Sequence, residues 1–166
     1  MILQNLHVPD NATLVTIDVT NLFPSIPQSE CLDTIYQEMC SHPDLLALDP
    51  NLIIHLLHLN INYNYFDFSD LVFQQIKGTA MGSAFSPTVA NIYMSTIVNK
   101  FLQFQKSKPL VFVRYIDDIF MIWLDTLDEL DTFITSLNSV NPNLKFTHES
   151  ASQSINLQGQ PLPLHQ

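Results

Sequence analysis

Apolar and polar residues alternate in two stretches that predict β-strands. Residues 12–19 place three β-branched apolar side chains on one face and Asp18 on the other, which is typical of a half-buried strand with a carboxylate near its end. Residues 144–149 alternate in the same way near the other end of the chain. We therefore expect two strands that each bury one face.

Two further stretches predict β-hairpins, because each contains two apolar runs with a short polar break. Residues 63–76 are rich in aromatic side chains and are interrupted by one Ser-Asp pair. Residues 110–124 are more strongly apolar, and Asp117 and Asp118 join their two runs. The second hairpin therefore carries two adjacent acids at its tip.

Apolar residues at helical spacing predict four helices, and Leu22–Pro27 is expected to turn the chain before the first of them. Asp49 and Ser86, each followed by Pro, are expected to start the second and third helices, and a capping box of Thr126 and Glu129 starts the fourth. The expected inward positions are, in order, Leu32, Ile35, Tyr36 and Met39; Leu52, Ile53, Leu56 and Leu57; Ala90, Met94, Ile97 and Phe101; and Leu130, Phe133, Ile134, Leu137 and Val140.

The predicted order is strand, helix, helix, hairpin, helix, hairpin, helix, strand. This order indicates an α+β fold in which helices pack on one face of a largely antiparallel sheet. The 166 residues, of which 46% are hydrophobic, suffice for one globular domain with a core of ordinary size.

Charge and cysteine content narrow the range of functions. The formal net charge of -10 removes the basic surface expected of a self-sufficient nucleic-acid binder. The two cysteines, Cys31 and Cys40, form neither a metal-binding pair nor a disulfide framework, so we expect a reducing compartment. No apolar run approaches the about 18 residues that span a bilayer, and the first residues lack a signal-peptide pattern. We expect a soluble, intracellular protein without a membrane partner.

The acids at the hairpin tip are the strongest chemical signal. Like charges on Asp117 and Asp118 repel each other, and a tight turn without glycine is strained. A divalent cation would offset the repulsion. The alternative is an ordinary acidic turn, since Asp is common in turns.

The position of Asp18 relative to that tip makes it a candidate metal ligand. If the first strand and the hairpin adjoin in one sheet, Asp18, Asp117 and Asp118 converge into a cluster of oxygen ligands suited to Mg²⁺. Two such ions can activate an attacking 3′-hydroxyl and stabilise a leaving pyrophosphate. Taken alone, Asp18 is more typical of a surface or capping acid.

A glycine-containing loop before the third helix is a weaker signal. Gly78 and Gly82 allow close backbone approach, and the helix start that follows offers N–H groups to an anion or a template phosphate. The alternative is a plain loop. His55 and His58 lie one helical turn apart, but without a third ligand nearby in sequence we do not expect a metal there.

Three of these segments resemble one known family. In order, they read IDVTNLFPSIP, GTAMGSAFSPTVANIYM and RYIDDIFMIW, which look like motifs A, B and C of the reverse transcriptase palm. Their wording is closest to Penelope-like retroelements. The motifs occupy about residues 14–27, 77–94 and 111–124.

The resemblance implies a role for each matching residue. Asp18 and Asp117 would hold two catalytic Mg²⁺ ions, with Mn²⁺ as a substitute and Asp118 assisting. Phe23 would lie under the incoming sugar and favour deoxynucleotides, because its ring would clash with a 2′-hydroxyl. The other implied positions are Met81, Gly82 and Ser83 at the nucleotide, and Tyr115, Gly78 and Lys145 at the primer or template.

By the same resemblance, the activity is two-metal RNA-directed DNA synthesis, with an RNA template, a DNA primer and deoxynucleoside triphosphates as partners. The palm is expected over residues 13–149, after a lead-in of residues 1–12 and before an irregular tail of residues 150–166. We expect the fingers to be largely absent and the thumb to be absent, so that regions of a longer product complete the site. A nuclear location fits this activity but follows from no residue.

Two other interpretations stay open. The chain is a catalytically inactive or domesticated retroelement remnant, or, more remotely, a divalent-cation-binding interaction module. The intact acids favour an active polymerase by ancestry, whereas the missing fingers and thumb favour a remnant.

Overall fold

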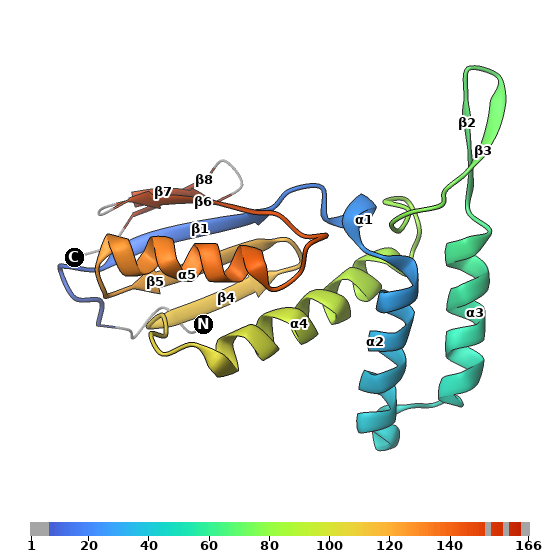
Figure 1. Ribbon diagram of the computed structural model, residues 1–166, viewed down its shortest axis with the longest axis horizontal. Coiled ribbons are helices and arrows are strands. Elements are labelled where there is room, and N and C mark those ends of the chain that lie inside the picture. Colours follow the sequence, from blue (N-terminus) through green and yellow to red (C-terminus); the bar gives the residue numbers. More distant parts are fainter. Residues whose placement is uncertain (1–6, 152–153, 158–159, 164–166) are drawn as a thin grey trace. The chain divides into compact units, whose positions relative to one another are not determined.

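The structure is a computed structural model that describes residues 7–151, 154–157 and 160–163. The chain divides into two compact units, each described by itself below (Figure 1). We call residues 1–20 with 101–166 the sheet unit, and residues 21–100 the helix-hairpin unit. Residues 1–6 of the expected lead-in lie outside the described residues.

A four-stranded antiparallel sheet forms the centre of the sheet unit. Its strands are β1 (Thr13–Val19), β4 (Val111–Tyr115), β5 (Asp118–Trp123) and β6 (Phe146–Ala151). They lie in the order β4-β5-β1-β6, so β1 is flanked on both sides. The strand and the hairpin that the sequence predicted therefore share one sheet.

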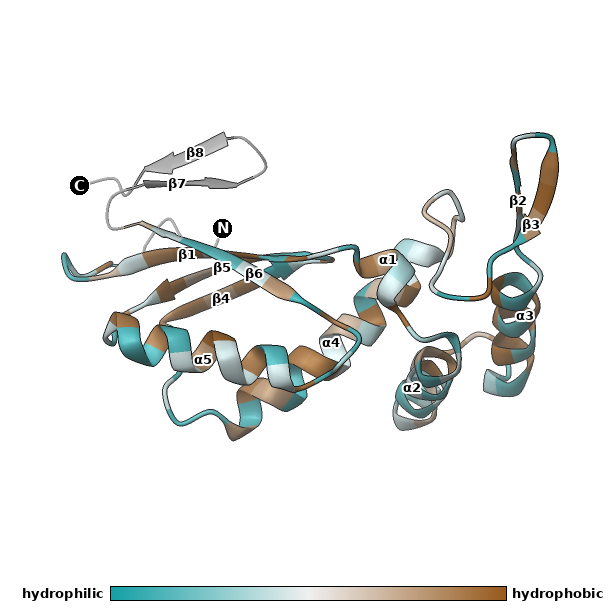
Figure 2. Cartoon of the chain, turned by 45° about the horizontal axis from the view of Figure 1, so that its top comes forward, coloured by the Kyte–Doolittle hydropathy of each residue, from teal (hydrophilic) through white to brown (hydrophobic). Residues whose placement is uncertain are grey.

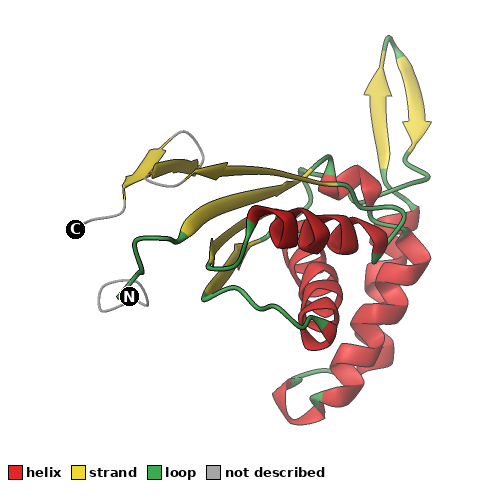
Figure 3. Cartoon of the chain, turned by 60° about the vertical axis from the view of Figure 1, so that its left-hand side comes forward, coloured by secondary structure: helices red, strands yellow, loops and turns green. Residues whose placement is uncertain are grey.

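Helix α5 (Leu127–Ser139) covers one face of this sheet (Figure 3). Trp123 of β5 packs against Phe133 of α5 with ring centroids 5.2 Å apart. Phe101, in the last turn of α4 (Ser86–Phe104), meets the same ring edge-on at 5.0 Å. The predicted arrangement of helices on one face of an antiparallel sheet is confirmed in this unit.

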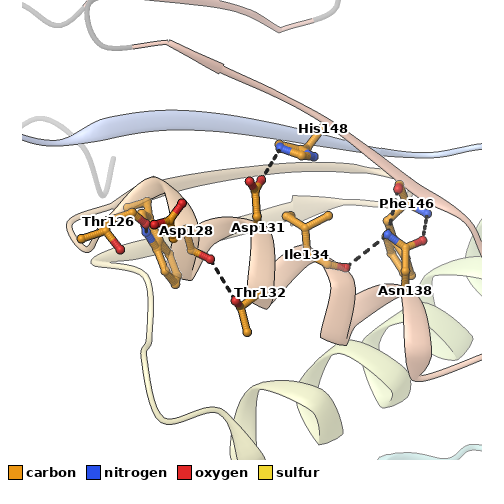
Figure 4. A network of polar contacts seen from close by, with 9 residues as sticks. Thr126, Asp128, Asp131, Thr132, Ile134, Asn138, Phe146 and His148 are labelled. Carbon is orange, nitrogen blue, oxygen red and sulfur yellow. Dashed lines mark hydrogen bonds and ion pairs between the residues drawn. The ribbon is translucent and has the colours of Figure 1, made fainter.

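Polar contacts hold the start of α5 and join the helix to β6 (Figure 4). The Glu129 N–H donates to Thr126 Oγ1 at 3.3 Å and the Thr126 N–H donates to Glu129 Oε2 at 3.1 Å, which is the predicted capping box. Asn138 makes two hydrogen bonds, at 2.9 and 3.0 Å, to the backbone of Phe146. The prediction that Val140 faces inward is wrong: it follows the last helical residue and is exposed.

The opposite face of the sheet carries a second apolar cluster. Its members are Ala12, Leu14, Val111, Phe120 and Ile122, with Val8, Leu124 and Ala151 packed against them. The sequence predicted that β1 buries only one face. Leu14 lies on the other face and is buried in this cluster, so both faces of β1 are partly buried. Asp18 lies on this same face of the sheet, two residues after Thr16 along β1.

The tail differs from the irregular segment that the sequence predicted. Residues Ser154–Leu157 form β7 and residues Gln160–Pro163 form β8, and the two strands pair with each other. Proline is tolerated in an edge strand, where its missing N–H removes no ladder bond, so the prolines did not exclude pairing. The remaining residues beyond 151 lie outside the described part of the chain.

The helix-hairpin unit contains most of the predicted helices. Its elements are α1 (Leu22–Ser25), α2 (Gln28–Ser41), a 3-10 turn (Pro43–Leu45), α3 (Pro50–Asn62), β2 (Tyr65–Phe68), β3 (Leu71–Gln74) and α4 up to Lys100. The segment expected to be a turn is thus a one-turn helix, α1. Asp49 caps α3 as predicted, accepting the Asn51 N–H at 2.9 Å. Ser86 is the first residue of α4 rather than its cap, and its buried hydroxyl has no partner among the described residues.

The hairpin β2-β3 is rich in apolar residues (Figure 2), and their side chains are exposed. The register pairs Phe66 with Phe73 and Phe68 with Leu71, so these four side chains share one face. A tight turn at Ser69 and Asp70, both with positive φ, joins the strands, as predicted from the Ser-Asp break. The predicted inward residues Leu52 and Leu56 of α3 are exposed as well, which corrects the expectation that this helix covers a sheet.

Within the described residues, no helix is both long and apolar enough to cross a bilayer.

The core of the sheet unit predicts a matched pair of stability changes. Leu137 of α5 is fully buried, so Leu137→Ala should lower the free energy of unfolding by about 2–4 kcal/mol through lost burial and a cavity. Leu127, the first residue of the same helix, is exposed, and Leu127→Ala should change it by less than ~0.5 kcal/mol. Urea denaturation followed by circular dichroism measures both; equal losses would contradict the packing of α5.

Candidate active site

Strand pairing brings the predicted carboxylates to the same end of neighbouring strands in the sheet unit. The last pair between β1 and β5 is Ile17 with Ile119, so the next residues in register are Asp18 and Asp118. Asp117 precedes Asp118 in the hairpin turn. The three acids that the sequence predicted to converge therefore come from the same end of two paired strands and the turn beside them.

These acids lie on the face of the sheet away from α5. Side chains alternate between the two faces along a strand, so Asp18 shares its face with Leu14, and Asp118 shares its face with Phe120. Both apolar residues belong to the second cluster, whereas Trp123 on the other face packs against α5. The acids thus lie on the same face of the sheet as the second apolar cluster, next to it along the strands.

The three acids repel one another electrostatically. Partial burial and then the charges of Asp117 and Asp118 raise the pKa of Asp18 above its usual range. Like charges disfavour the ionised form, so the cluster is least stable when all three carboxylates are charged. A bound cation would relieve this repulsion.

The hairpin tip has a strained backbone. Ile116 has a φ of 53°, in the left-handed region that β-branched residues rarely adopt. It is the first of two residues between the paired Tyr115 and Asp118, where a positive φ is the mark of a type II′ turn and glycine is favoured. The strain predicted for this glycine-free turn is confirmed.

Arg114 supports the tip, and the sequence analysis did not single it out. Its Nη1 donates a hydrogen bond of 2.8 Å to the carbonyl of Ile116, and burial lowers the pKa of its guanidinium. An arginine stays charged even so, which places a cation beside the acidic turn. The available signal was that Arg114 is the single arginine of the chain and lies three residues before Asp117.

Tyr115 and Lys145 lie at the same end of the strands as the acids. Tyr115 pairs with Asp118 and shares its face, and its side chain is 72% exposed. The carbonyl of Lys145 accepts the Thr20 N–H at 2.9 Å, which places Lys145 beside the end of β1. Both residues that the resemblance assigned to the primer thus border the carboxylates.

The acids fit a hard cation as part of its ligand set. Across residues 7–151, 154–157 and 160–163, no three His, Cys, Asp or Glu side chains are gathered closely enough to hold one ion. Mg²⁺ is commonly bound by one or two carboxylates together with waters and substrate phosphates. Carboxylate oxygens are the donors it prefers, so these residues fit such an ion without forming a complete cage.

Phe23 and Gly78 lie together in the helix-hairpin unit. The Phe23 carbonyl accepts the Thr79 N–H at 2.9 Å. A Cβ on Gly78 would lie only 2.5 Å from the same carbonyl oxygen, so glycine is required there. The motif A and motif B segments are therefore in direct contact within this unit.

The other loop residues are more open. The Met81 side chain is exposed, and a Cβ on Gly82 would meet no atom within 4 Å. The Ser83 N–H donates to the Ala80 carbonyl at 3.2 Å, which closes a turn. Met81 is therefore exposed, and the space beside Gly82 is open.

Comparison with known families decides the classification. Residues 3–148 match the family described as reverse transcriptase (RNA-dependent DNA polymerase). The chain belongs to the reverse transcriptase family. The matched range includes every candidate residue of this reverse transcriptase chain, from Asp18 to Lys145. No curated protein matches it.

Solved polymerase structures share the fold. A telomerase from Candida tropicalis, truncated from its C-terminal domain, aligns with a TM-score of 0.67 at 18% identity over 92% of this chain and 34% of that one. Telomerase from Candida albicans in complex with a TWJ fragment of telomeric RNA gives 0.68 at 14% identity, over 92% and 29%. The RNA-dependent RNA polymerase of BmCPV at the elongation state gives 0.69 at 14%, over 92% and 16%.

These likenesses concern the fold alone, because the identities are low. They confirm the expected palm-type α+β architecture of the reverse transcriptase chain. The chain spans about a third of the length of the telomerases and less of the viral polymerase.

The raised pKa of Asp18 predicts a pH-dependent stability change. The folded state holds the Asp18 proton more tightly than the unfolded state, so ionisation of Asp18 destabilises the fold as pH rises through the folded pKa. Asp18→Asn should therefore raise the Tm at pH 7 by about 1–3 °C, a small effect because the group is largely exposed. The gain should vanish in acid below the unfolded pKa, where wild-type Asp18 is protonated in both states.

Glu149→Gln is the matched control for Asp18→Asn, since it removes the same charge from a neighbouring strand of the same sheet. Thermal melts at both pH values compare the variants. A gain from Asp18→Asn that is equal at both pH values, or equal to that of Glu149→Gln, would contradict the carboxylate cluster.

The strain at Ile116 predicts that glycine is tolerated there. Ile116→Gly should leave the free energy of unfolding unchanged or raise it by up to ~1 kcal/mol, because released strain offsets the entropy cost of glycine. Val113→Gly, in the extended part of β4, should lower it by about 1 kcal/mol. Urea denaturation tests both, and a larger loss at Ile116 than at Val113 would show that the turn is not strained.

Proposed function

We propose that this chain is the palm portion of an RNA-directed DNA polymerase of a retroelement, closest to Penelope-like elements, that transfers nucleotides with two bound metal ions. The observation that carries the proposal is the cluster of Asp18, Asp117 and Asp118 at one edge of the sheet, with the strained turn beside it. Carboxylates that repel one another are retained where a cation is to be bound. Membership of the reverse transcriptase family supplies the reaction class.

In the proposed reaction, a primer 3′-hydroxyl loses its proton and attacks the α-phosphorus of a deoxynucleoside triphosphate, and pyrophosphate leaves. Two Mg²⁺ ions, or Mn²⁺ in their place, would supply the positive charge that activates the attacking oxygen and stabilises the leaving one. Asp18 and Asp117 would hold the metals, and Asp118 would assist. The charged Arg114 side chain supports the turn through its hydrogen bond to the Ile116 carbonyl.

The remaining candidate residues act on position rather than on bond formation. Tyr115 and Lys145 contact the primer at the edge of the sheet beside the acids. Phe23 excludes a ribose 2′-hydroxyl. The nucleotide is supported by Met81, Gly82 and Ser83. Gly78 gives the loop the shape that faces the template. An RNA template and a DNA primer complete the complex, with fingers and thumb supplied by other regions of a longer product.

A second candidate is a catalytically inactive retroelement remnant. The net charge of -10 favours it, because binding of nucleic acid at physiological salt relies on cations that neutralise phosphates. The two candidates differ in whether the folded chain extends a primer.

The test is primer extension on an RNA template with the purified chain and Mg²⁺ or Mn²⁺, next to a thermal melt with and without the metal. Asp117→Asn should reduce extension at least about 100-fold, as expected from losing a metal ligand. It should also abolish the rise in Tm that Mn²⁺ produces in the wild type. Glu149→Gln, an exposed acid on β6, should change neither readout.

The outcomes separate the candidates. A folded Asp117→Asn chain that extends primers like the wild type would contradict the metal assignment. A wild type that responds to Mn²⁺ without extending primers would favour the remnant, or a palm that needs its missing regions.

A further inference from the structure

Two long-range hydrogen bonds fasten the start of motif B to motif A and to the first residue of α2 within the helix-hairpin unit. The Thr79 N–H donates to the Phe23 carbonyl at 2.9 Å. Gln28 Nε2, at the start of α2, donates to the Gly78 carbonyl at 3.0 Å. Consecutive residues of the loop are thus held from two sides by residues about 50 positions earlier in the chain.

The contact is too close for any side chain at Gly78. Gly78 has a φ of 71°, and a Cβ built there would lie 2.5 Å from both the Phe23 carbonyl oxygen and the Pro24 Cα. Both obstructing atoms belong to the backbone, so neither can move aside cheaply. The loop backbone therefore lies directly against the backbone of Phe23, with Gln28 closing the other side.

Phe23 depends on this contact because its own element is too short to hold it. Helix α1 has four residues and follows Asn21, whose φ of 52° is left-handed. Its N-terminus has no side-chain cap, and a single helical turn is unfavourable without tertiary support. The Phe23 backbone is therefore supported from outside α1, by the loop that contains Gly78 and Thr79.

We propose that Gln28 is a positioning residue for Phe23: through Gly78 and Thr79 it holds the Phe23 backbone, and thereby sets how strongly the ring discriminates deoxynucleotides from ribonucleotides. This inference rests on the proposed function, in which Phe23 lies under the sugar. Gln28 donates its hydrogen bond to the loop, so the proposed effect on Phe23 passes through Gly78 and Thr79.

The informative variant is Gln28→Met, which keeps the length of the side chain and removes the N–H donor. Loss of one net hydrogen bond corresponds to a factor of about five. We expect the Thr79 amide to exchange with solvent about fivefold faster, as followed by NMR on the full chain. We also expect the ratio of the Kd values for UTP and dUTP, which differ only in the 2′-hydroxyl, to fall about fivefold toward unity when titrated with Mg²⁺.

Three further variants calibrate the result. Phe23→Ala sets the ratio expected when the ring is absent. Gln28→Lys retains a donor that can reach the Gly78 carbonyl and should restore the wild-type ratio. Gln74→Met removes a similar bond, from Gln74 Nε2 to the Asn62 carbonyl at 2.6 Å in the hairpin region, and should leave the ratio unchanged.

Each outcome decides the proposal. Faster Thr79 exchange with an unchanged nucleotide ratio would make Gln28 merely structural and overturn its positioning role. Unchanged Thr79 exchange would overturn the contact itself, whether or not the chain binds nucleotides. A wild type that does not distinguish the two nucleotides would instead refute the sugar-selecting role of Phe23 in the proposed function, and the positioning role with it.

Discussion

The register of β1 between β5 and β6 is the constraint on which the candidate site depends. Side chains alternate along a strand with a period of two, so a slip of one residue would turn Asp18 toward α5 and bring Ile17 to the face of the carboxylates. Val15, Ile17 and Val19 are buried, and that burial opposes such a slip. The apolar core thus fixes where the acids stand, although none of its residues takes part in the proposed chemistry.

The edge of the sheet that holds the acids concentrates unfavourable interactions. Carboxylates repel one another there, and Ile116 adopts a conformation that suits glycine. Strain and perturbed pKa values that persist at one place are typical of functional sites, since the surrounding fold has to compensate for them. Part of that compensation is visible in the hydrogen bond from Arg114 to the turn.

The distribution of charge and apolar surface bears on what the chain can do alone. Residues 1–76 contain no Lys or Arg, and the hairpin β2-β3 exposes Phe66, Phe68, Leu71 and Phe73 on one face. A two-stranded hairpin is marginal in water without cover for its apolar face. In the proposed function, cations for the nucleic acid have to come from metal ions and from regions beyond this chain.

The sequence by itself determined the order of elements and the chemistry of the tip. Local signals suffice for both: alternation in β1, the capping box at Thr126, and two adjacent acids in a turn without glycine each depend on a few neighbouring residues. Tertiary structure decided which of these elements meet. The second buried face of β1 and the contact of Gly78 with Phe23 depend on partners 50 or more residues away. The exposed face of α3 lacks cover among the described residues. No local sequence pattern encodes such contacts. Convergence of Asp18 with the hairpin acids was predicted only on the condition that their strands adjoin, and the hydrogen-bonded register of β1 with β5 met that condition.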